Sequence, residues 1–259
     1  MLSQNQIKHI NALKSKKFRE DYRQFIAEGH KIVADLLESP YFIDGIYAVS
    51  SWIVENLWKV QKKNIPVYET IPREMERISA LSSPSPVLAV VNIPLTPAAN
   101  PRLPTSNLTL LLDDIRDPGN LGTIIRVADW FGIENVICSE TCVDLYNPKV
   151  VQATMGSIAR VDVRYADLEK ILNEISGKVS VYGTSLDGEN LFEQYELSNN
   201  GVILIGNESR GISSSLNQFV SKKLFIPSFG KSDSGKAESL NAAVATAIIC
   251  AEFRRQGRH

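Results

Sequence analysis

The sequence has no long apolar run. None of its apolar stretches approaches the roughly 20 consecutive residues that a helix needs to cross a bilayer, which argues against a membrane-spanning protein. The first 18 residues contain lysines but lack the apolar core of a secretory signal peptide. These absences predict a soluble, intracellular protein that acts in the cytoplasm.

Cysteine and histidine are scarce, with three residues of each in the chain. An odd number of cysteines without secretory features predicts reduced thiols. Cys138 and Cys142 are four residues apart, but no second Cys or His pair accompanies them, and the histidines are scattered. Because a structural zinc ion needs four ligands, we expect ordinary packing of these thiols and no metal site.

The chain also carries little net charge, −1 at pH 7, which argues against a protein that coats nucleic acid through bulk charge. The basic residues are unevenly distributed, however. The first 31 residues contain seven Lys or Arg against three acidic residues. Such a cluster suits either a solvated helix face or local contacts with phosphates, and the sequence alone leaves both open.

Prolines mark one boundary. Four of them fall within eleven residues between Pro94 and Pro104, and proline removes backbone donors and favours extended conformations. We therefore predict a linker at 94–107 between two domains of ordinary size, 1–93 and 108–259. The first is predicted to be a small α/β domain, with strands at Phe25–Glu28, Ile43–Val49, Val67–Tyr68 and Val87–Ile93 and helices between them.

The second domain is also predicted to be α/β. Its apolar runs are short and bounded by turn residues, which is typical of strands buried on both faces of a largely parallel sheet. A final helix, Ser239–Arg255, is apolar around most of its girth and is expected to be well buried. The predicted strands are Thr109–Leu112, Val136–Cys138, Val179–Tyr182, Val202–Ile205 and Leu224–Ile226.

The first candidate site is Leu111–Gly122 and the residues that follow it. A strand ends in a turn rich in Asp, Pro, Gly and Asn, and an amphipathic helix begins near Asn120. Gly122, Arg126 and Asp129 fall on one side of that helix. A glycine inside a helix beside an arginine indicates that another group approaches the backbone closely. A plain strand–turn–helix with a surface arginine remains the alternative.

The second candidate is Leu204–Ile212, where a buried strand opens into a loop with two glycines. Glu208 and Arg210 lie just beyond the carboxyl end of that strand, which is where ligands bind in open α/β sheets. Turn formation alone would also use glycine and asparagine here.

The third candidate, Phe225–Asn241, contains Gly230–Lys236, which fits the G-x-x-x-x-G-K pattern of phosphate-binding loops. Ala237 replaces the hydroxyl residue that would bind magnesium, and the 22 residues after it are too few for the rest of a nucleotide hydrolase. The better prediction is a flexible loop that ends in a helix cap at Ser239. Free backbone N–H groups and the side chains of Ser239 and Asn241 are expected to contact a ligand there.

Taken together, these segments resemble the SpoU/TrmH family, RNA 2′-O-methyltransferases of the SPOUT superfamily. The N-terminal segments Lys16–Arg19 and Phe25–Gly29 look like the substrate-binding domain of that family. The motifs that carry the resemblance are Asp117–Gly122 with Arg126, then Gly206–Glu208 with Gly211, then Ile226-Pro227 with Ser239–Asn241.

The resemblance implies an α/β fold with a C-terminal SPOUT domain, which has a deep trefoil knot and a mostly parallel sheet, and a small N-terminal α/β substrate-binding domain. It implies S-adenosyl-L-methionine as cofactor, RNA as substrate, and a homodimer with residues of both subunits near each site. No metal and no membrane are implied. The implied catalytic residues are Arg126, Asn120, Glu208, Ser239 and Asn241, and the implied cofactor-binding residues are Gly206, Ile226 and Leu240.

The resemblance makes Arg126 central, but a guanidinium, with a pKa above about 12, is not expected to act as a base. We expect Arg126 instead to grip a phosphate beside the target ribose and to stabilise developing negative charge on its oxygen. The separate N-terminal domain favours ribosomal RNA as the substrate. The alternatives are a transfer RNA 2′-O-methyltransferase, a methyltransferase of a base, and a relative that binds RNA without catalysis.

Overall fold

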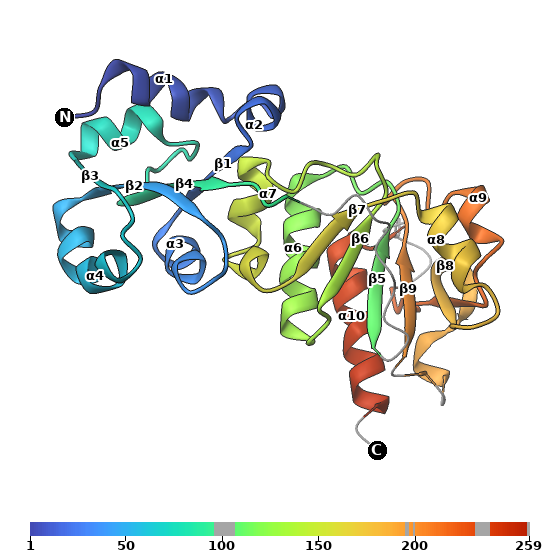
Figure 1. The fold of residues 1–259 in the computed structure, drawn as a ribbon. Coiled ribbons are helices and arrows are strands. Elements are labelled where there is room, and N and C mark those ends of the chain that lie inside the picture. Colours follow the sequence, from blue (N-terminus) through green and yellow to red (C-terminus); the bar gives the residue numbers. More distant parts are fainter. Residues whose placement is uncertain (96–106, 195–196, 199, 231–238, 258–259) are drawn as a thin grey trace. The chain divides into compact units, whose positions relative to one another are not determined.

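The computed structural model describes residues 1–95, 107–194, 197–198, 200–230 and 239–257 (Figure 1). Contacts divide the chain into two compact units. Unit 1 comprises Met1–Pro97 together with Asp144–Arg160, and unit 2 comprises Ala98–Val143 together with Val161–His259. The linker expected at 94–107 stays a prediction, since 96–106 lie outside the described residues.

Unit 1 contains a mixed four-stranded sheet in the order β1-β4-β2-β3. Strand β4 is antiparallel to β1 and β2, and β2 is parallel to β3. The strands are β1 (Gln24–Glu28), β2 (Ile43–Val49), β3 (Val67–Thr70) and β4 (Val87–Asn92). The helices are α1 (Gln4–Ala12), α2 (Lys16–Tyr22), α3 (His30–Leu37), α4 (Ser50–Lys62), α5 (Pro72–Ile78) and α7 (Pro148–Ala153), with a short 3-10 turn at Ser157–Ala159.

The expected small α/β domain is confirmed, and β2 has the predicted bounds. In α3, Ile32, Val33, Leu36 and Leu37 are buried, the spacing that gives a helix one apolar face. Strand β4 is buried from Val87 to Val91 because it lies between two other strands in the centre of the sheet.

The segment Asp144–Arg160 belongs to unit 1 although it follows β6 (Asn135–Cys138) of unit 2 in the chain. The guanidinium of Arg19 is buried and donates to a carboxylate oxygen of Asp144 through Nη2 at 2.6 Å and through Nε at 3.0 Å. The rings of Phe25 and Tyr146 lie 4.7 Å apart between centroids. An ion pair and an aromatic contact thus join this segment to α2 and β1.

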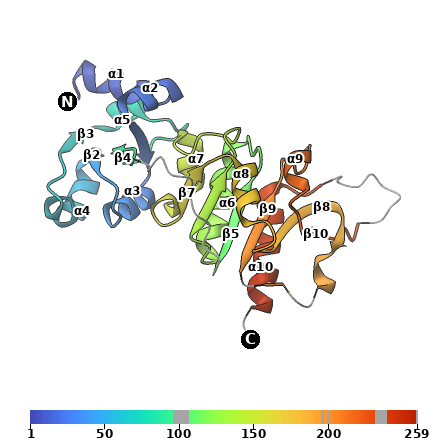
Figure 2. The same ribbon diagram turned by 45° about the vertical axis from the view of Figure 1, so that its right-hand side comes forward.

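Unit 2 is built on a six-stranded, all-parallel sheet in the order β10-β8-β9-β5-β6-β7, which confirms the expected parallel sheet. The strands are β5 (Leu108–Leu112), β6 (Asn135–Cys138), β7 (Asp162–Tyr165), β8 (Val181–Asn190), β9 (Gly201–Ile205) and β10 (Lys222–Phe225). The helices are α6 (Pro118–Trp130), α8 (Leu168–Ile175), α9 (Ser214–Asn217) and α10 (Ala242–Gln256), with a 3-10 turn at Leu191–Glu193. Helices α6 and α10 pack side by side in both views (Figures 1 and 2).

Three elements of unit 2 differ from the sequence-based expectation. Strand β7 was not predicted, because it is a partly exposed edge strand without an apolar run. Strand β8 extends to Asn190 and pairs with β10 on both sides of a register shift. Helix α10 begins at Ala242 and not at Ser239, and it is buried on one face only, since Val244 is 49% exposed.

Candidate active site

The first two motifs meet because their strands are neighbours in the sheet. Strands β5 and β9 pair in parallel, with Leu112 beside Ile205, and both end there. The loops 113–117 and 206–211 therefore emerge side by side at the carboxyl edge of the sheet, the edge at which ligands bind in such folds.

A chain of two hydrogen bonds connects all three motifs. The Nδ2 group of Asn241 donates to Oδ1 of Asn120 at 2.7 Å, and Nδ2 of Asn120 donates to Oε1 of Glu208 at 2.5 Å. The structure thus brings together three predicted site residues that are far apart in the sequence.

Helix capping fixes the direction of this chain. Asn241 is the N-cap of α10, and its Oδ1 accepts from the backbone N–H groups of Ala243 and Val244. Its Nδ2 is the remaining polar group and reaches Asn120. Asn120 must then offer its oxygen to Asn241 and its N–H to Glu208. Asp117 caps α6 by accepting from the Asn120 N–H, which holds Asn120 in the first turn.

A cavity of about 460 Å³ lies at the same edge of the sheet. The residues expected to bind cofactor, Gly206, Ile226 and Leu240, all line it. Glu208 and Ser239 from the expected catalytic set line it as well. Ser239 does not cap a helix, contrary to expectation, because Asn241 takes that position.

Close approach of two backbone segments accounts for Gly206. A Cβ atom at this position would lie 2.3 Å from the carbonyl carbon of Gly211 and 2.4 Å from the nitrogen of Ile212. Asn207 and Gly211 exchange both of their backbone hydrogen bonds, at 3.1 and 2.8 Å, and so close the loop over Gly206. Only glycine fits beneath a loop closed in this way.

Asp114 is a site residue that the sequence analysis did not single out. Its backbone adopts a left-handed conformation (φ 59°), and its carbonyl accepts from Nδ2 of Asn207 at 2.9 Å. Its carboxylate accepts from Arg116 and Arg210. Burial raises the pKa of Asp114, but hydrogen bonds from Arg116 and Thr141 and the charges of both arginines outweigh burial and bring the pKa below its ordinary value. In the sequence, two consecutive acidic residues at the end of a strand, Asp113 and Asp114, could have indicated a site residue here.

The structure places Arg126 away from this group. Arg126 is exposed on α6 and is not among the described residues that line the cavity. A position six residues after Asn120 on a helix lies about 120° around the axis from it, so the two side chains leave α6 in different directions.

Cys138, Cys142 and Cys250 are free and buried. Within the described ranges, no group of three or more His, Cys, Asp or Glu side chains is arranged to hold a metal ion. In that same part of the chain, no helix has the length and apolar character needed to cross a membrane. The loop-like sequence Gly230–Lys236 lies, apart from Gly230, outside the described residues.

Comparisons with known proteins agree with this geometry. Residues 107–251 match the SpoU rRNA Methylase family, and residues 4–89 match the MRM3-like substrate binding domain. A relative in Bacillus subtilis, the 23S rRNA (guanosine(2553)-2′-O)-methyltransferase RlmP, is 29% identical over 96% of this chain and 95% of that protein. The 23S rRNA (uridine(2479)-2′-O)-methyltransferase of Streptomyces viridochromogenes is 28% identical over 82% of this chain and 74% of that protein.

Two solved structures are similar over the whole chain. A protein of the TrmH family from Porphyromonas gingivalis is 35% identical, with a TM-score of 0.82 over 99% of this chain and 100% of that one. An AdoMet-bound rRNA methyltransferase from Sinorhizobium meliloti is 30% identical, with a TM-score of 0.85 over 100% and 97%. Together with the family match over more than half of the chain, these findings show that the protein belongs to the SpoU rRNA methylase family.

Proposed function

We propose that this protein transfers a methyl group from S-adenosylmethionine to a ribose 2′-hydroxyl of ribosomal RNA. The observation that carries the proposal is the hydrogen-bonded chain Glu208–Asn120–Asn241, which joins side chains of all three motifs beside the cavity. Relatives named as 2′-O-methyltransferases of 23S rRNA, and one solved with AdoMet, support the choice of substrate and cofactor.

The cavity suits this cofactor in size and chemistry. A volume of about 460 Å³ falls in the range of roughly 300–1,000 Å³ that is usual for small-molecule sites. Apolar side chains line the cavity and are suited to contact an adenine ring; they belong to Leu224, Ile226 and Leu240. Gly206 also lines the cavity and has no side chain, so its backbone can contact the cofactor directly. When bound, S-adenosylmethionine supplies an electrophilic methyl group on a sulfonium.

The chain's own residues orient the ribose. Oε1 of Glu208 accepts from Asn120, which leaves Oε2 as an acceptor for the ribose hydroxyl. Asn120 and Asn241 hold that carboxylate in place, and Ser239 completes the pocket. Such alignment contributes on the order of 7–11 kcal/mol to lowering a reaction barrier in favourable cases.

The position of Arg126 leads us to place the second half of the site on another copy of this chain. Arg126 is exposed on α6 and lies outside the cavity lining, while exposed apolar side chains lie at the start of α10 and just before it. Val244 is 49% exposed and Leu240 45%. A homodimer through α6 and α10 buries this apolar surface and brings the partner's guanidinium to the ribose, where it binds a phosphate and stabilises the developing oxyanion.

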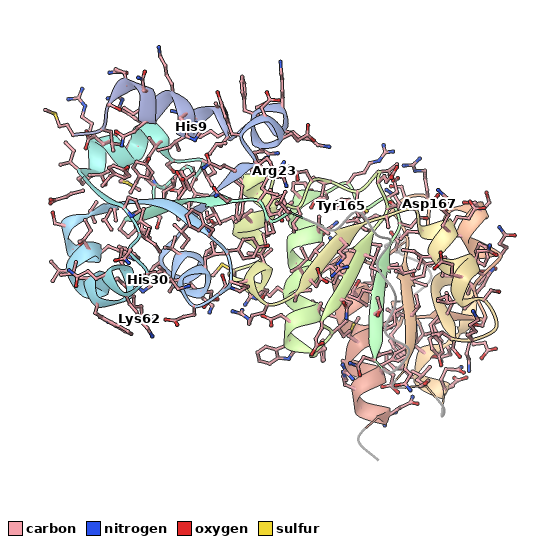
Figure 3. All side chains as sticks on the ribbon, in the orientation of Figure 1. His9, Arg23, His30, Lys62, Tyr165 and Asp167 are labelled. Atoms are coloured by element: carbon pink, nitrogen blue, oxygen red, sulfur yellow. The ribbon has the colours of Figure 1, made fainter. Side chains whose placement is uncertain are left out.

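Unit 1 is proposed to bind the RNA, in accord with its match to a substrate binding domain. The rings of Phe18 and Tyr22 on α2 are exposed and stack with centroids 6.1 Å apart, and His9 meets Tyr22 edge-on at 4.8 Å. Unpaired bases stack on such exposed rings. Exposed Arg23, labelled with His9 in Figure 3, and nearby Lys17 add positive charge.

Two further parts of the proposal come from the resemblance. The deep knot is supported by the convergence on one cavity of the segments after β9, after β10 and before α10. Action in the cytoplasm is supported by the buried free thiols of Cys138, Cys142 and Cys250.

The test is to incubate the protein with transcribed 23S ribosomal RNA and S-adenosylmethionine, and to identify the product nucleoside by mass spectrometry. A nucleoside methylated on its 2′-oxygen is expected. A methylated base would overturn the proposed position of transfer, and product on transfer RNA alone would overturn the proposed substrate. Binding of RNA without any product would indicate a relative that has lost catalysis.

A further inference from the structure

Three charged side chains gather where the first two motif loops meet. Nε of Arg116 donates to Oδ1 of Asp114 at 2.8 Å, and Nη2 of Arg210 donates to Oδ2 of the same carboxylate. Asp114 is 12% exposed, whereas the side chains of Arg116 and Arg210 are 64% and 62% exposed. A nearly buried carboxylate thus holds two exposed guanidiniums in fixed positions.

Both guanidiniums keep donors for a ligand. A guanidinium carries five N–H donors in a fixed fork, and each arginine commits one nitrogen to Asp114. The fork geometry matches the oxygens of a phosphate, which it binds in bidentate fashion. Because Asp114 already restrains both side chains, a ligand loses less of its binding energy to ordering them.

The charge of this group favours a ligand with a single negative charge. The lowered pKa of Asp114 keeps its carboxylate ionised at neutral pH, so the three side chains together carry a charge of +1. A phosphodiester of an RNA backbone carries −1 and would neutralise the group.

The location favours RNA over the cofactor as that ligand. Arg210 lines the cavity but Arg116 does not, so a group that touches both arginines lies at the rim. The loop that carries Arg210 also carries Glu208, and the side chain of Asn207 braces it by accepting from the N–H of Arg210 at 3.2 Å. A phosphate held at Arg210 would therefore be placed at a defined distance from Glu208.

We propose that Arg116 and Arg210, positioned by Asp114, bind a backbone phosphate of the RNA next to the ribose that receives the methyl group. This site rests on the proposed function for the identity of its RNA. It fixes the register of the RNA strand at the cavity, as phosphate contacts commonly do.

The test compares Arg116→Gln/Arg210→Gln with the control Arg164→Gln. Arg164 also pairs with a carboxylate in unit 2, at 2.6 Å from Asp162, but on edge strand β7. Dissociation constants for transcribed 23S ribosomal RNA are measured by filter binding across a series of KCl concentrations. Loss of one phosphate contact is expected to lower the salt slope by about 0.7 and to weaken binding roughly fivefold at 0.1 M salt. The control should match wild type.

A second variant, Arg116→Lys/Arg210→Lys, keeps the charge and should recover the salt slope, which separates lost charge from damage to the fold. Calorimetry with S-adenosylmethionine should give the same affinity for all variants. If Arg116→Gln/Arg210→Gln has the same salt slope as the control, the proposed phosphate site is wrong. The proposal is also wrong if that variant loses cofactor affinity and keeps RNA affinity, because Arg210 then binds the cofactor. If the Gln variant has a lower salt slope but the wild-type protein methylates no ribose, the phosphate site is supported and the proposed function is refuted.

Discussion

Asn120 connects Glu208 to Asn241, and each of its two side-chain polar atoms has one defined partner. Asn120→Asp keeps the shape but replaces the donor to Glu208 with a second carboxylate oxygen, so two negative charges would meet. A hydrogen bond to a charged group contributes about 1.5–3 kcal/mol, so we expect kcat to fall by a factor of roughly 10–150.

The measurement is the steady-state rate of methylation of ribosomal RNA with RNA and cofactor both saturating. Asn173→Asp, at an exposed position on α8, is the matched control and should retain full activity. Wild-type kcat in Asn120→Asp would show that the hydrogen-bonded chain has no part in the reaction.

Gly206 is the second residue whose identity is set by its surroundings. In Gly206→Ala the new Cβ would meet backbone atoms at 2.3 and 2.4 Å, and the loop that lines the cavity must shift. Overpacking of this kind costs about 1–3 kcal/mol, and we expect cofactor affinity to fall roughly 5- to 150-fold. Calorimetry with S-adenosylmethionine measures the loss.

Gly132→Ala is the control for that substitution. Gly132, unlike Gly206, has a left-handed backbone (φ 62°), and a Cβ there meets no atom within 4 Å. Gly132→Ala should lose some stability, because alanine is strained in a left-handed backbone, and should keep its cofactor affinity. Equal affinities in the two variants would mean that the clash at Gly206 is relieved without disturbing the cavity.

Among the elements, the segment Asp144–Arg160 is joined to α2 by a buried ion pair. Arg19→Met leaves the Asp144 carboxylate, with 19% of its side chain exposed, without its guanidinium. Removing one partner of a buried ion pair costs about 3–5 kcal/mol, so α2 and α7 should exchange their amide hydrogens much faster.

Hydrogen exchange followed by mass spectrometry resolves these helices within the full chain. Lys16→Met breaks the exposed pair with Glu20 on the same helix and should have little effect. Adding Asp144→Asn to Arg19→Met should restore part of the protection, because it removes the unpaired charge. Unchanged exchange in Arg19→Met would show that packing alone holds the segment.

Differences between expected and observed elements have physical causes. Strand β7 begins with Asp162 and carries Arg164, which an edge strand tolerates because solvent reaches its side chains. Ser239 has the side chain of a good helix cap, yet Asn241 caps α10 because its amide also reaches Asn120. In both cases tertiary surroundings override a local signal.

For the whole molecule, a shared site predicts complementation between two inactive variants. Arg126→Ala lacks the guanidinium, and Gly206→Ala, with its weakened cofactor affinity, is nearly inactive when S-adenosylmethionine is kept near the wild-type dissociation constant. If Arg126 acts across the dimer, a mixed dimer has one complete site, with the cavity of the first variant and the guanidinium of the second. Random mixing makes about half of the dimers mixed, so activity should reach about a quarter of wild type.

Methylation assays on the two variants, unfolded and refolded together, measure this recovery, and refolding each variant alone gives the baseline. Light scattering should report twice the chain mass of 28.7 kDa. Val244→Glu, which places a charge on the proposed interface, should halve that mass. No recovery on mixing would place Arg126 and the cavity of its own chain in one site.

The sequence by itself determined the α/β class, the parallel sheet of unit 2, the bounds of β2 and the family, because these follow from short-range apolar patterns and from motifs of a few residues. Only the tertiary structure decided that Asn120, Glu208 and Asn241 form one hydrogen-bonded chain, that Asp114 holds two arginines, and that Asp144–Arg160 packs with unit 1. The physical reason is that strand order and helix capping fix which side chains meet, and neither is encoded by the spacing of residues along the chain.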